Sequence, residues 1–134
     1  MKPFSLKIVT PDGLLFDGQA QELIVRTTSG DMGFLAGHMN CVAPLGMGRA
    51  TVVIDGKKHY AACIGGMVSV IDGAVSLLPT TFEWAQDIDL ARAERSYERA
   101  QSALRNKASS DADIRLAQAR LRRALVRKSI ASMK

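Results

Sequence analysis

The sequence predicts an α+β fold: an N-terminal antiparallel β-sandwich, or flattened barrel, followed by a C-terminal antiparallel two-helix hairpin. Three observations lead to this prediction. Hydrophobic residues alternate through the first half of the chain, and Asp-Gly pairs typical of tight turns separate the alternating segments. From about Phe82 onward, hydrophobic residues recur at helical spacing. We therefore expect a sandwich domain at residues 1–84 and a helical domain at residues 85–134.

Positive charge is concentrated in the C-terminal part of the chain. The 134 residues are enough for one full domain and an appendage, and they carry a net charge of +5. Residues 1–86 contain six Lys and Arg against seven Asp and Glu, whereas residues 87–134 contain twelve against six. Because the tail alone is basic, we expect the tail to meet an acidic partner.

The cysteines and the hydropathy pattern favour an intracellular protein. Cys41 and Cys63 lie in apolar, strand-like runs, which is typical of buried thiols in a reducing compartment. The sequence has no Cys-x-x-Cys motif and no His/Cys cluster, so no metal site is expected. It has no signal-peptide core and no apolar run of about 20 residues, so we expect a cytoplasmic chain that does not cross a membrane.

The first strands are marked by alternation and by β-branched residues. Residues 4–9 alternate, and Pro11-Asp12-Gly13 predicts the turn that ends this strand. Residues 14–16 predict a second strand. Residues 22–28 are rich in β-branched side chains and predict a core strand.

Two hairpins follow, each closed by an Asp-Gly pair. The predicted strands are residues 49–54 and 58–63 around Asp55-Gly56, and residues 67–71 and 74–78 around Asp72-Gly73. Between the hairpins, Gly65-Gly66 predicts a bulge or a close approach of two backbone segments.

Residues 27–40 interrupt the strands and are predicted to form a loop. Their glycines are spaced too irregularly for a dinucleotide-binding fingerprint, and no helical pattern follows. We expect these glycines to supply positive φ angles. His38 has no second metal-binding or catalytic partner nearby in sequence, so it is typical of a hydrogen-bonded loop residue.

The first predicted helix begins after Asp87, which we expect to be its N-cap. One stripe of this helix is apolar: Leu90, Ala93, Tyr97, Ala100 and Leu104. A polar column runs beside the stripe: Asp89, Arg92, Ser96 and Arg99. Spacing alone favours a solvated face for this column, and a ligand-binding column is the alternative.

The second predicted helix follows a short polar connection at residues 106–110, in which Ser110 and Asp113 resemble a capping box. Its apolar stripe consists of Ile114, Ala117, Leu121, Ala124, Leu125 and Ala131. We expect this stripe to pack antiparallel against the first helix. Arg120, Arg123 and Arg127 are expected opposite the stripe, with Arg115 and Arg122 at its edges.

The second helix lacks the mixed charges of an ordinary solvated helix. Residues 114–134 contain seven Lys and Arg and no acidic residue. Arg123 and Arg127 are four residues apart, and such like-charged pairs destabilise an isolated helix by a few tenths of a kcal/mol. We expect an anion or an acidic surface to pair with these arginines in at least one state.

Five sequence blocks resemble a known family along essentially the whole chain. They are residues 9–13 (VTPDG), 29–38 (SGDMGFLAGH), 42–45 (VAPL), 65–70 (GGMVSV) and 88–93 (IDLARA). Their order and spacing are similar to those of the epsilon subunit of bacterial F-type ATP synthase. The family's fold, a β-sandwich followed by a helical hairpin, agrees with the fold expected from periodicity.

The resemblance implies a non-catalytic rotor subunit of a proton-translocating ATP synthase. The sandwich would clamp the gamma subunit and sit on the c-ring, and Asp31 and His38 match positions at those contacts. The hairpin would either lie folded or extend along gamma into the alpha/beta hexamer, where it inhibits ATP hydrolysis. Its inhibitory contacts to acidic loops of beta would come from Arg115, Arg120, Arg122, Arg123 and Arg127. The subunit would be peripheral, on the cytoplasmic face of the bacterial plasma membrane.

The resemblance also implies a regulatory ATP site, although no cofactor is required. In Bacillus-type members the folded hairpin binds ATP through a motif that corresponds to residues 88–104 here. The implied site consists of Glu83, Ile88, Asp89, Arg92, Arg99, Arg123 and Arg127. Ser96 stands where the motif has Ala, and Ala103 stands where it has Arg. Arginines from two helices could converge on phosphates while the carboxylates orient the rest of the nucleotide.

Two other classes of protein fit the sequence less well. An enzyme is poorly supported, because no nucleophile–base pair, metal cluster or P-loop is present in the sequence. A small nucleic-acid-binding module would account for the basic tail. The tail lacks stacking aromatics, however, and we therefore expect protein partners and no nucleic acid.

Overall fold

A computed structural model describes residues 2–105 and 111–133. The chain divides into two compact units, Met1–Trp84 and Ala85–Lys134. The first unit contains all ten strands of the described residues, and the second contains a 3₁₀ turn and two helices. Among the described residues, no helix has both the length and the apolar character needed to cross a membrane.

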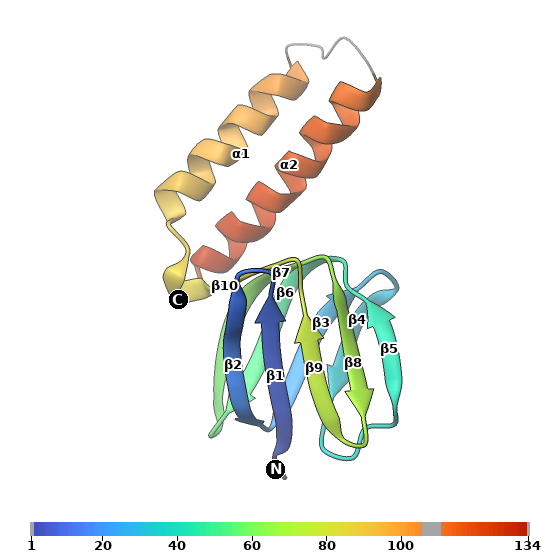
Figure 1. Ribbon diagram of the computed structural model, residues 1–134. Helices are drawn as coiled ribbons and strands as arrows, with labels where there is room; N and C mark the ends of the chain where they lie inside the picture. The colour runs from blue at the N-terminus through green and yellow to red at the C-terminus, as the bar shows by residue number, and fades with distance from the viewer. Residues whose placement is uncertain (1, 106–110, 134) are drawn as a thin grey trace. The chain divides into compact units, whose positions relative to one another are not determined.

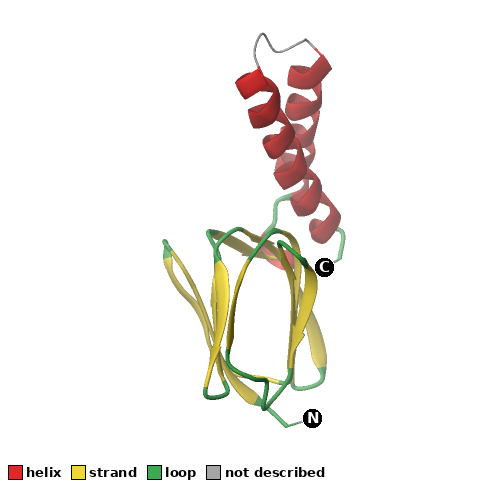
Figure 2. Ribbon diagram, turned by 90° about the vertical axis from the view of Figure 1, so that its right-hand side faces the viewer, coloured by secondary structure: helices red, strands yellow, loops and turns green. Residues whose placement is uncertain are grey.

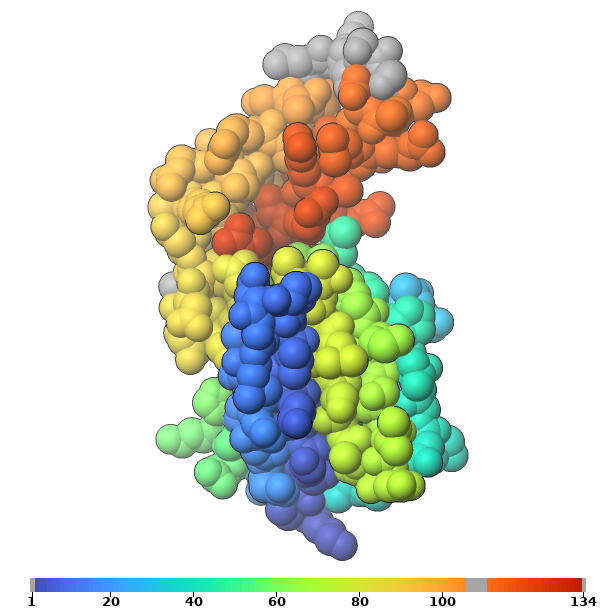
Figure 3. Space-filling model, in the orientation of Figure 1, coloured from blue at the N-terminus to red at the C-terminus, as the bar shows by residue number. Residues whose placement is uncertain are grey.

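The first unit is a sandwich of two five-stranded sheets, which Figure 2 shows as two layers of strands. The first sheet has the order β2-β1-β9-β8-β5, and Figure 3 shows one side of it, with blue β1 and β2 next to yellow-green β9 and β8. Its strands are β1 (Phe4–Thr10), β2 (Gly13–Ala20), β5 (Cys41–Pro44), β8 (Met67–Ile71) and β9 (Ala74–Leu78). The second sheet has the order β10-β7-β6-β3-β4. Its strands are β3 (Glu22–Thr27), β4 (Gly30–Phe34), β6 (Met47–Ile54), β7 (Lys57–Ile64) and β10 (Thr81–Trp84).

Alternation of side chains builds the core between the two sheets. On β1, Phe4, Leu6 and Ile8 are buried, whereas Ser5 and Lys7 are exposed. The opposite sheet contributes fully buried aliphatic and aromatic side chains to the same cluster: Leu23, Val25, Phe34 and Val52. The predicted sandwich is therefore confirmed, with the apolar face of each sheet turned toward the other.

Both Asp-Gly hairpins form as predicted. Asp55 and Gly56 have φ angles of 50° and 79°, and Asp72 and Gly73 have φ angles of 49° and 80°. Two consecutive positive φ angles define the type I′ turn, whose twist matches that of the strands on either side. The turns join β6 to β7 and β8 to β9.

Three strands were not predicted as separate elements, and one of them lies in a predicted loop. β4 falls within the predicted loop at residues 27–40, β5 follows that loop, and β10 begins at the predicted change of period. Each is an edge strand held by a single neighbour: β3 for β4, β8 for β5 and β7 for β10. The pairing of β1 with β9 is parallel, an exception within sheets that are otherwise antiparallel (Figure 1). A partner strand supplied the hydrogen bonds that local propensity did not predict.

The second unit is an antiparallel helical hairpin. It begins with a 3₁₀ turn, η1 (Ala85–Asp87), and continues with α1 (Leu90–Arg105) and α2 (Asp111–Ala131) (Figure 1). The N-cap of α1 is Asp89, because its Oδ1 accepts a hydrogen bond of 3.1 Å from the backbone N–H of Arg92. The prediction of Asp87 as N-cap is wrong, since Asp87 belongs to η1. The predicted capping box begins at Ser110, which lies outside the described residues.

Alanines form the seam between the two helices. The buried residues of α1 are Ala93 and Ala100, and those of α2 are Ala117, Ala124, Ile130 and Ala131. The larger apolar residues of the predicted stripes lie further out: Leu90, Ile114 and Leu125 are 38%, 37% and 50% exposed. Small side chains let the helix axes approach closely, so the leucines border the seam and do not fill it.

Candidate interaction sites

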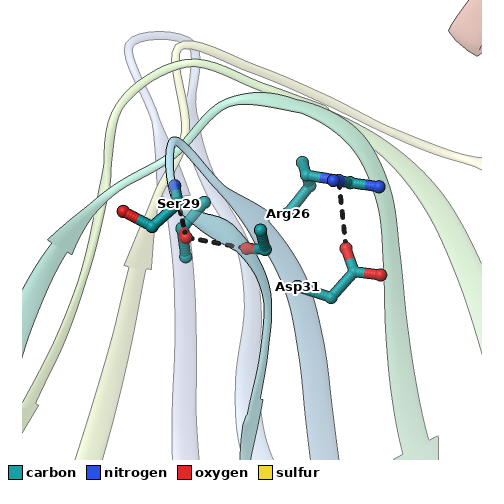
Figure 4. Close-up of polar contacts among 5 residues, drawn as sticks. Arg26, Ser29 and Asp31 are labelled. Atoms are coloured by element: carbon teal, nitrogen blue, oxygen red, sulfur yellow. Dashed lines mark hydrogen bonds and ion pairs between the residues drawn. The ribbon is translucent and has the colours of Figure 1, made fainter.

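The turn between β3 and β4 presents Asp31 at the surface of the sandwich. Thr27 Oγ1 donates a hydrogen bond of 2.7 Å to the carbonyl of Gly30 and accepts one of 3.1 Å from the backbone N–H of Ser29. Gly30 has a φ of 119°, which a side chain would disfavour. Figure 4 shows this turn with Asp31 just beyond it.

Asp31 is oriented by an arginine on the neighbouring strand. Arg26 lies directly opposite Asp31 in the β3–β4 register. Its Nε is 3.1 Å from Asp31 Oδ1, and both side chains are more than half exposed (Figure 4). Such an exposed pair contributes only about 0–1 kcal/mol to stability. The pair places a positive charge beside the Asp31 carboxylate at the surface of the sandwich.

His38 is a half-buried, hydrogen-bonded loop residue, as predicted. Its Nδ1 lies 2.8 Å from the carbonyl oxygen of Met39. A carbonyl only accepts, so Nδ1 carries the proton in this contact. The ring also packs against Phe34 at a centroid distance of 4.8 Å, and the backbone N–H donates to the carbonyl of Leu35. His38 is therefore fixed in place by the sandwich.

Cys63 is a buried thiol in the core of the sandwich. It lies in the core on β7, and burial raises its pKa from 9.0 to about 12. The neutral thiol therefore persists well above neutral pH. Among the described residues, no three His, Cys, Asp or Glu side chains gather into a group that could hold a metal ion.

One contact between the helices shows which side of α1 faces which side of α2. Lys128 Nζ of α2 lies over the ring of Tyr97 of α1, 4.8 Å from its centroid. Successive helix residues are about 100° apart. Tyr97 and Leu104 therefore lie on one side of the seam on α1, and Lys128 and Leu121 lie on the matching side of α2. We call this side of the hairpin the tyrosine face.

The other side of the hairpin is basic. We measure the angle around α1 from Ala100, which lies in the seam. The residues on the side away from Tyr97 are then Arg92, Ser96 and Arg99. We measure the angle around α2 from Ala124 in the same way. The residues on the side away from Lys128 are Arg120, Arg123 and Arg127. We call these six residues, Arg92, Ser96, Arg99, Arg120, Arg123 and Arg127, the basic face. Five arginines from two helices thus share one side of the hairpin.

The predicted placement of the α2 arginines relative to the seam is wrong. Arg120 and Arg127 lie only about 40° and 60° around the helix from Ala124, and Arg127 is half-buried. Arg115 and Arg122, predicted at the edges, point away from the seam and are exposed. The prediction gave equal weight to the leucines, whereas the close packing is centred on alanines.

The residues of the implied ATP site are distributed over both units. Glu83 lies on β10 in the first unit, half-buried and opposite Ala62. Asp89 caps α1 next to the basic face, which contains Arg92, Arg99, Arg123 and Arg127. The Ile88 side chain is 1% exposed, and its backbone N–H donates to the carbonyl of Ala85. Ile88 therefore acts through packing within the second unit.

Sequence reasoning missed several side-chain contacts, both within one element and between elements. Within α1, Gln101 Nε2 donates a hydrogen bond of 3.1 Å to the hydroxyl oxygen of Tyr97. On the sandwich, the Arg49 guanidinium lies 5.3 Å from the Tyr60 ring centroid. The i, i+4 spacing of Tyr97 and Gln101 was a usable signal, but the partner on α2 could not be known without the register of the hairpin.

Comparison with protein families accounts for both units. Residues 3–85 match the model described as ATP synthase, Delta/Epsilon chain, beta-sandwich domain. Residues 86–132 match ATP synthase, Delta/Epsilon chain, long alpha-helix domain. The chain belongs to the ATP synthase delta/epsilon family. As a member it is an accessory, non-catalytic chain, and the predicted resemblance to the bacterial epsilon subunit is confirmed.

Curated relatives in the delta/epsilon family cover the whole chain. The chain is 41% identical over 131 residues to an ATP synthase epsilon chain of Bacillus velezensis, covering 98% of each protein. It is 39% identical over 135 residues to the epsilon chain of Ruminococcus albus, covering 100% of each. This family membership favours the protein-partner reading over the nucleic-acid alternative.

Solved structures share the fold at lower identity. A chain in the Euglena gracilis mitochondrial ATP synthase, a structure of OSCP, F1 and the c-ring, has a TM-score of 0.82 and 24% identity, with 98% of this chain and 82% of that chain covered. A chain in the central stalk and c-ring structure of the Tetrahymena thermophila mitochondrial ATP synthase has a TM-score of 0.69 and 12% identity, with 95% of each chain covered. Both likenesses concern the fold.

Proposed function

We propose that this chain is a rotor subunit of a bacterial, proton-translocating ATP synthase, at the cytoplasmic face of the plasma membrane. Its sandwich binds the gamma subunit and the c-ring, and its hairpin regulates ATP hydrolysis. The relatives named ATP synthase epsilon chain support this proposal along the whole chain. Asp31 and His38 are the proposed contacts to the c-ring and gamma, since both are held by a rigid sandwich at its surface.

The basic face is the observation that carries the regulatory part of the proposal. Clustered arginines repel one another, so the folded hairpin gains from any anion that neutralises them. In the folded state, ATP would supply its phosphates to Arg92, Arg99, Arg123 and Arg127, with Glu83, Ile88 and Asp89 completing the site. In the extended state, acidic loops of the beta subunits would pair with Arg115, Arg120, Arg122, Arg123 and Arg127.

Ligand binding to one state is enough to control the hairpin. A nucleotide that binds only the folded hairpin favours it by about 2.7 kcal/mol at 100 times its dissociation constant. A balanced equilibrium then moves to roughly 99:1 in favour of folding. High ATP would keep the inhibitory hairpin folded, and ATP depletion would release it.

Calorimetry on the isolated chain tests ATP binding. Arg92→Ala should abolish the heat of binding, whereas Ser96→Ala should preserve or strengthen it. Exposed Arg105 lies on α1 outside the basic face, so Arg105→Ala is a matched control for loss of one positive charge. If the wild-type chain gives neither heat nor a thermal shift at millimolar ATP, the regulatory site is refuted.

Hydrolysis by the assembled enzyme tests inhibition. Replacing all five arginines of the proposed beta contact with Ala should relieve inhibition of ATP hydrolysis. Single replacements should have small effects, because an exposed ion pair contributes only about 0–1 kcal/mol. Unchanged hydrolysis in the fivefold variant would show that charge is not the means of inhibition.

A further inference from the structure

The contact between Tyr97 and Lys128 joins the two helices through a pair of side chains with a defined geometry. The Lys128 ammonium lies over the Tyr97 ring, and Gln101 holds the ring from its own helix through a 3.1 Å hydrogen bond. All three side chains are half-buried. A cation is attracted to an aromatic ring only when the two side chains lie at the same height along the helix axes.

The alanine seam alone cannot determine which residue of α2 lies at the height of Tyr97. Ala93 and Ala100 are seven residues apart, and so are Ala117, Ala124 and Ala131. Sliding one helix past the other by seven residues, about 10 Å, would bring alanine against alanine again. The alanine spacing alone therefore does not single out one register, and in coiled coils a single polar position can do so.

The residues seven positions from Tyr97 on α1 make the shifted registers less favourable than the observed one, because none of them is aromatic. Leu90 and Leu104 lie seven residues before and after Tyr97. In a register shifted by seven residues, the Lys128 ammonium would lie against a leucine and lose its aromatic partner. In one of these registers, Tyr97 would face Leu121. Only the observed register pairs the ring with the cation.

We propose that Tyr97 and Lys128 are positioning residues that select one register of the hairpin. Through that register they determine which arginines of α1 lie beside which arginines of α2 on the basic face. Their effect on ATP binding rests on the function proposed above, whereas their effect on register does not. They act from the tyrosine face, on the side of the seam away from the proposed nucleotide.

A distance measurement reads the register directly. Spin labels at Ala91→Cys and Ala112→Cys occupy exposed positions near the starts of the antiparallel helices, so their separation lies mainly along the hairpin. Cys41→Ser and Cys63→Ala remove the native thiols. A seven-residue shift should change the label distance by about 10 Å.

Wild type should give one distance by pulsed electron paramagnetic resonance. Tyr97→Leu and Lys128→Met should each add a second, displaced distance, whereas Lys128→Arg should restore the single one. Tyr97→Phe keeps the ring and should retain the wild-type distance. Arg105→Met is the control for removing a cation from the end of α1.

ATP titration then separates this inference from the proposed function. The apparent dissociation constant should rise by the reciprocal of the in-register fraction, about twofold when half the molecules are shifted. A single unchanged distance in Tyr97→Leu and Lys128→Met would overturn the inference. Loss of helical circular dichroism in those variants without a second distance would also overturn it, because the pair would then serve stability alone. Absence of ATP binding in the wild type would refute the nucleotide site and leave the register result standing.

Discussion

At the residue scale, the buried thiol of Cys63 makes stability depend on pH. Its pKa is about 12 in the folded chain against 9.0 when solvated, so the folded state holds the proton more tightly. The stabilisation that comes from the neutral, buried thiol is fully present below pH 9 and is lost as the pH rises toward 12. Within that window, stability should fall by up to about 1.4 kcal/mol per pH unit.

Urea unfolding of the wild type and Cys63→Ala between pH 8 and about 11 checks this prediction. The relevant quantity is the difference between the two proteins, which removes effects of alkaline pH that are common to both. Cys63→Ala should lose stability at pH 8 and show a shallower decline. Parallel curves would contradict the burial of a neutral thiol.

Asp89 is also tested at the residue scale, as the cap of α1. Asp89→Ala should destabilise the hairpin by about 1 kcal/mol, because the N–H of Arg92 loses its acceptor. Asp89→Asn should retain most of the stability. Asp87→Ala should stay within about 0.5 kcal/mol of wild type, since Asp87 is exposed in η1. Thermal unfolding followed by helical circular dichroism distinguishes the three variants.

At the scale of elements, Gly66 shows where a side chain cannot be accommodated. Its φ is +87°, and a Cβ would collide with the backbone carbonyl of Leu78 and approach Pro79 Cα to 2.8 Å. Gly66→Ala should destabilise the sandwich by about 3 kcal/mol or more. Gly73 has a similar φ of +80° with no atom near the added Cβ, so Gly73→Ala should cost only about 1 kcal/mol. Equal losses in urea unfolding would show that backbone strain alone matters.

The sequence predicted elements well where the signal was local. The Asp55-Gly56 and Asp72-Gly73 turns, the close approach at Gly66 and the polar column of α1 could each be inferred from adjacent residues. β4 could not, because its two glycines and one Asp have low strand propensity, and pairing with β3 overrides it.

The basic face, too, could be predicted only where the signal was local. The side of α1 that carries Arg92 and Arg99 was predicted, since spacing within one helix suffices. The side of α2 that carries Arg120 and Arg127 was not, because the leucines suggested a different packing direction. The contact of Tyr97 with Lys128 shows which sides of the two helices match, and the sequence of neither helix reveals it.

At the scale of the whole molecule, the division into units makes a prediction about truncation. A chain ending at Trp84 should fold, because it retains β10 and every strand that pairs with it. If the proposed partners are correct, it should also bind gamma and the c-ring. The change of hydrophobic period near Phe82 falls within β10, whereas the first unit ends at Trp84.

A chain ending at Thr81 provides the matched comparison. It lacks Phe82, which is buried in the core, and exposes the edge of β7. Loss of a buried aromatic side chain costs about 3–5 kcal/mol, so this version should unfold at much lower urea. Equal midpoints for the two truncations would mean that β10 does not belong to the folded sandwich.

The alanine seam also bears on how the hairpin responds to temperature. Alanine carries a single methyl group, so separating α1 from α2 exposes little apolar surface. Heat capacity rises on exposure by about 0.45 cal/mol/K for each Å² of such surface. Separation of the helices should therefore have a small heat-capacity change and a nearly straight dependence of free energy on temperature. The balance between closed and separated helices should therefore change at a nearly constant rate as the cell warms or cools, without a temperature of maximum stability in the physiological range.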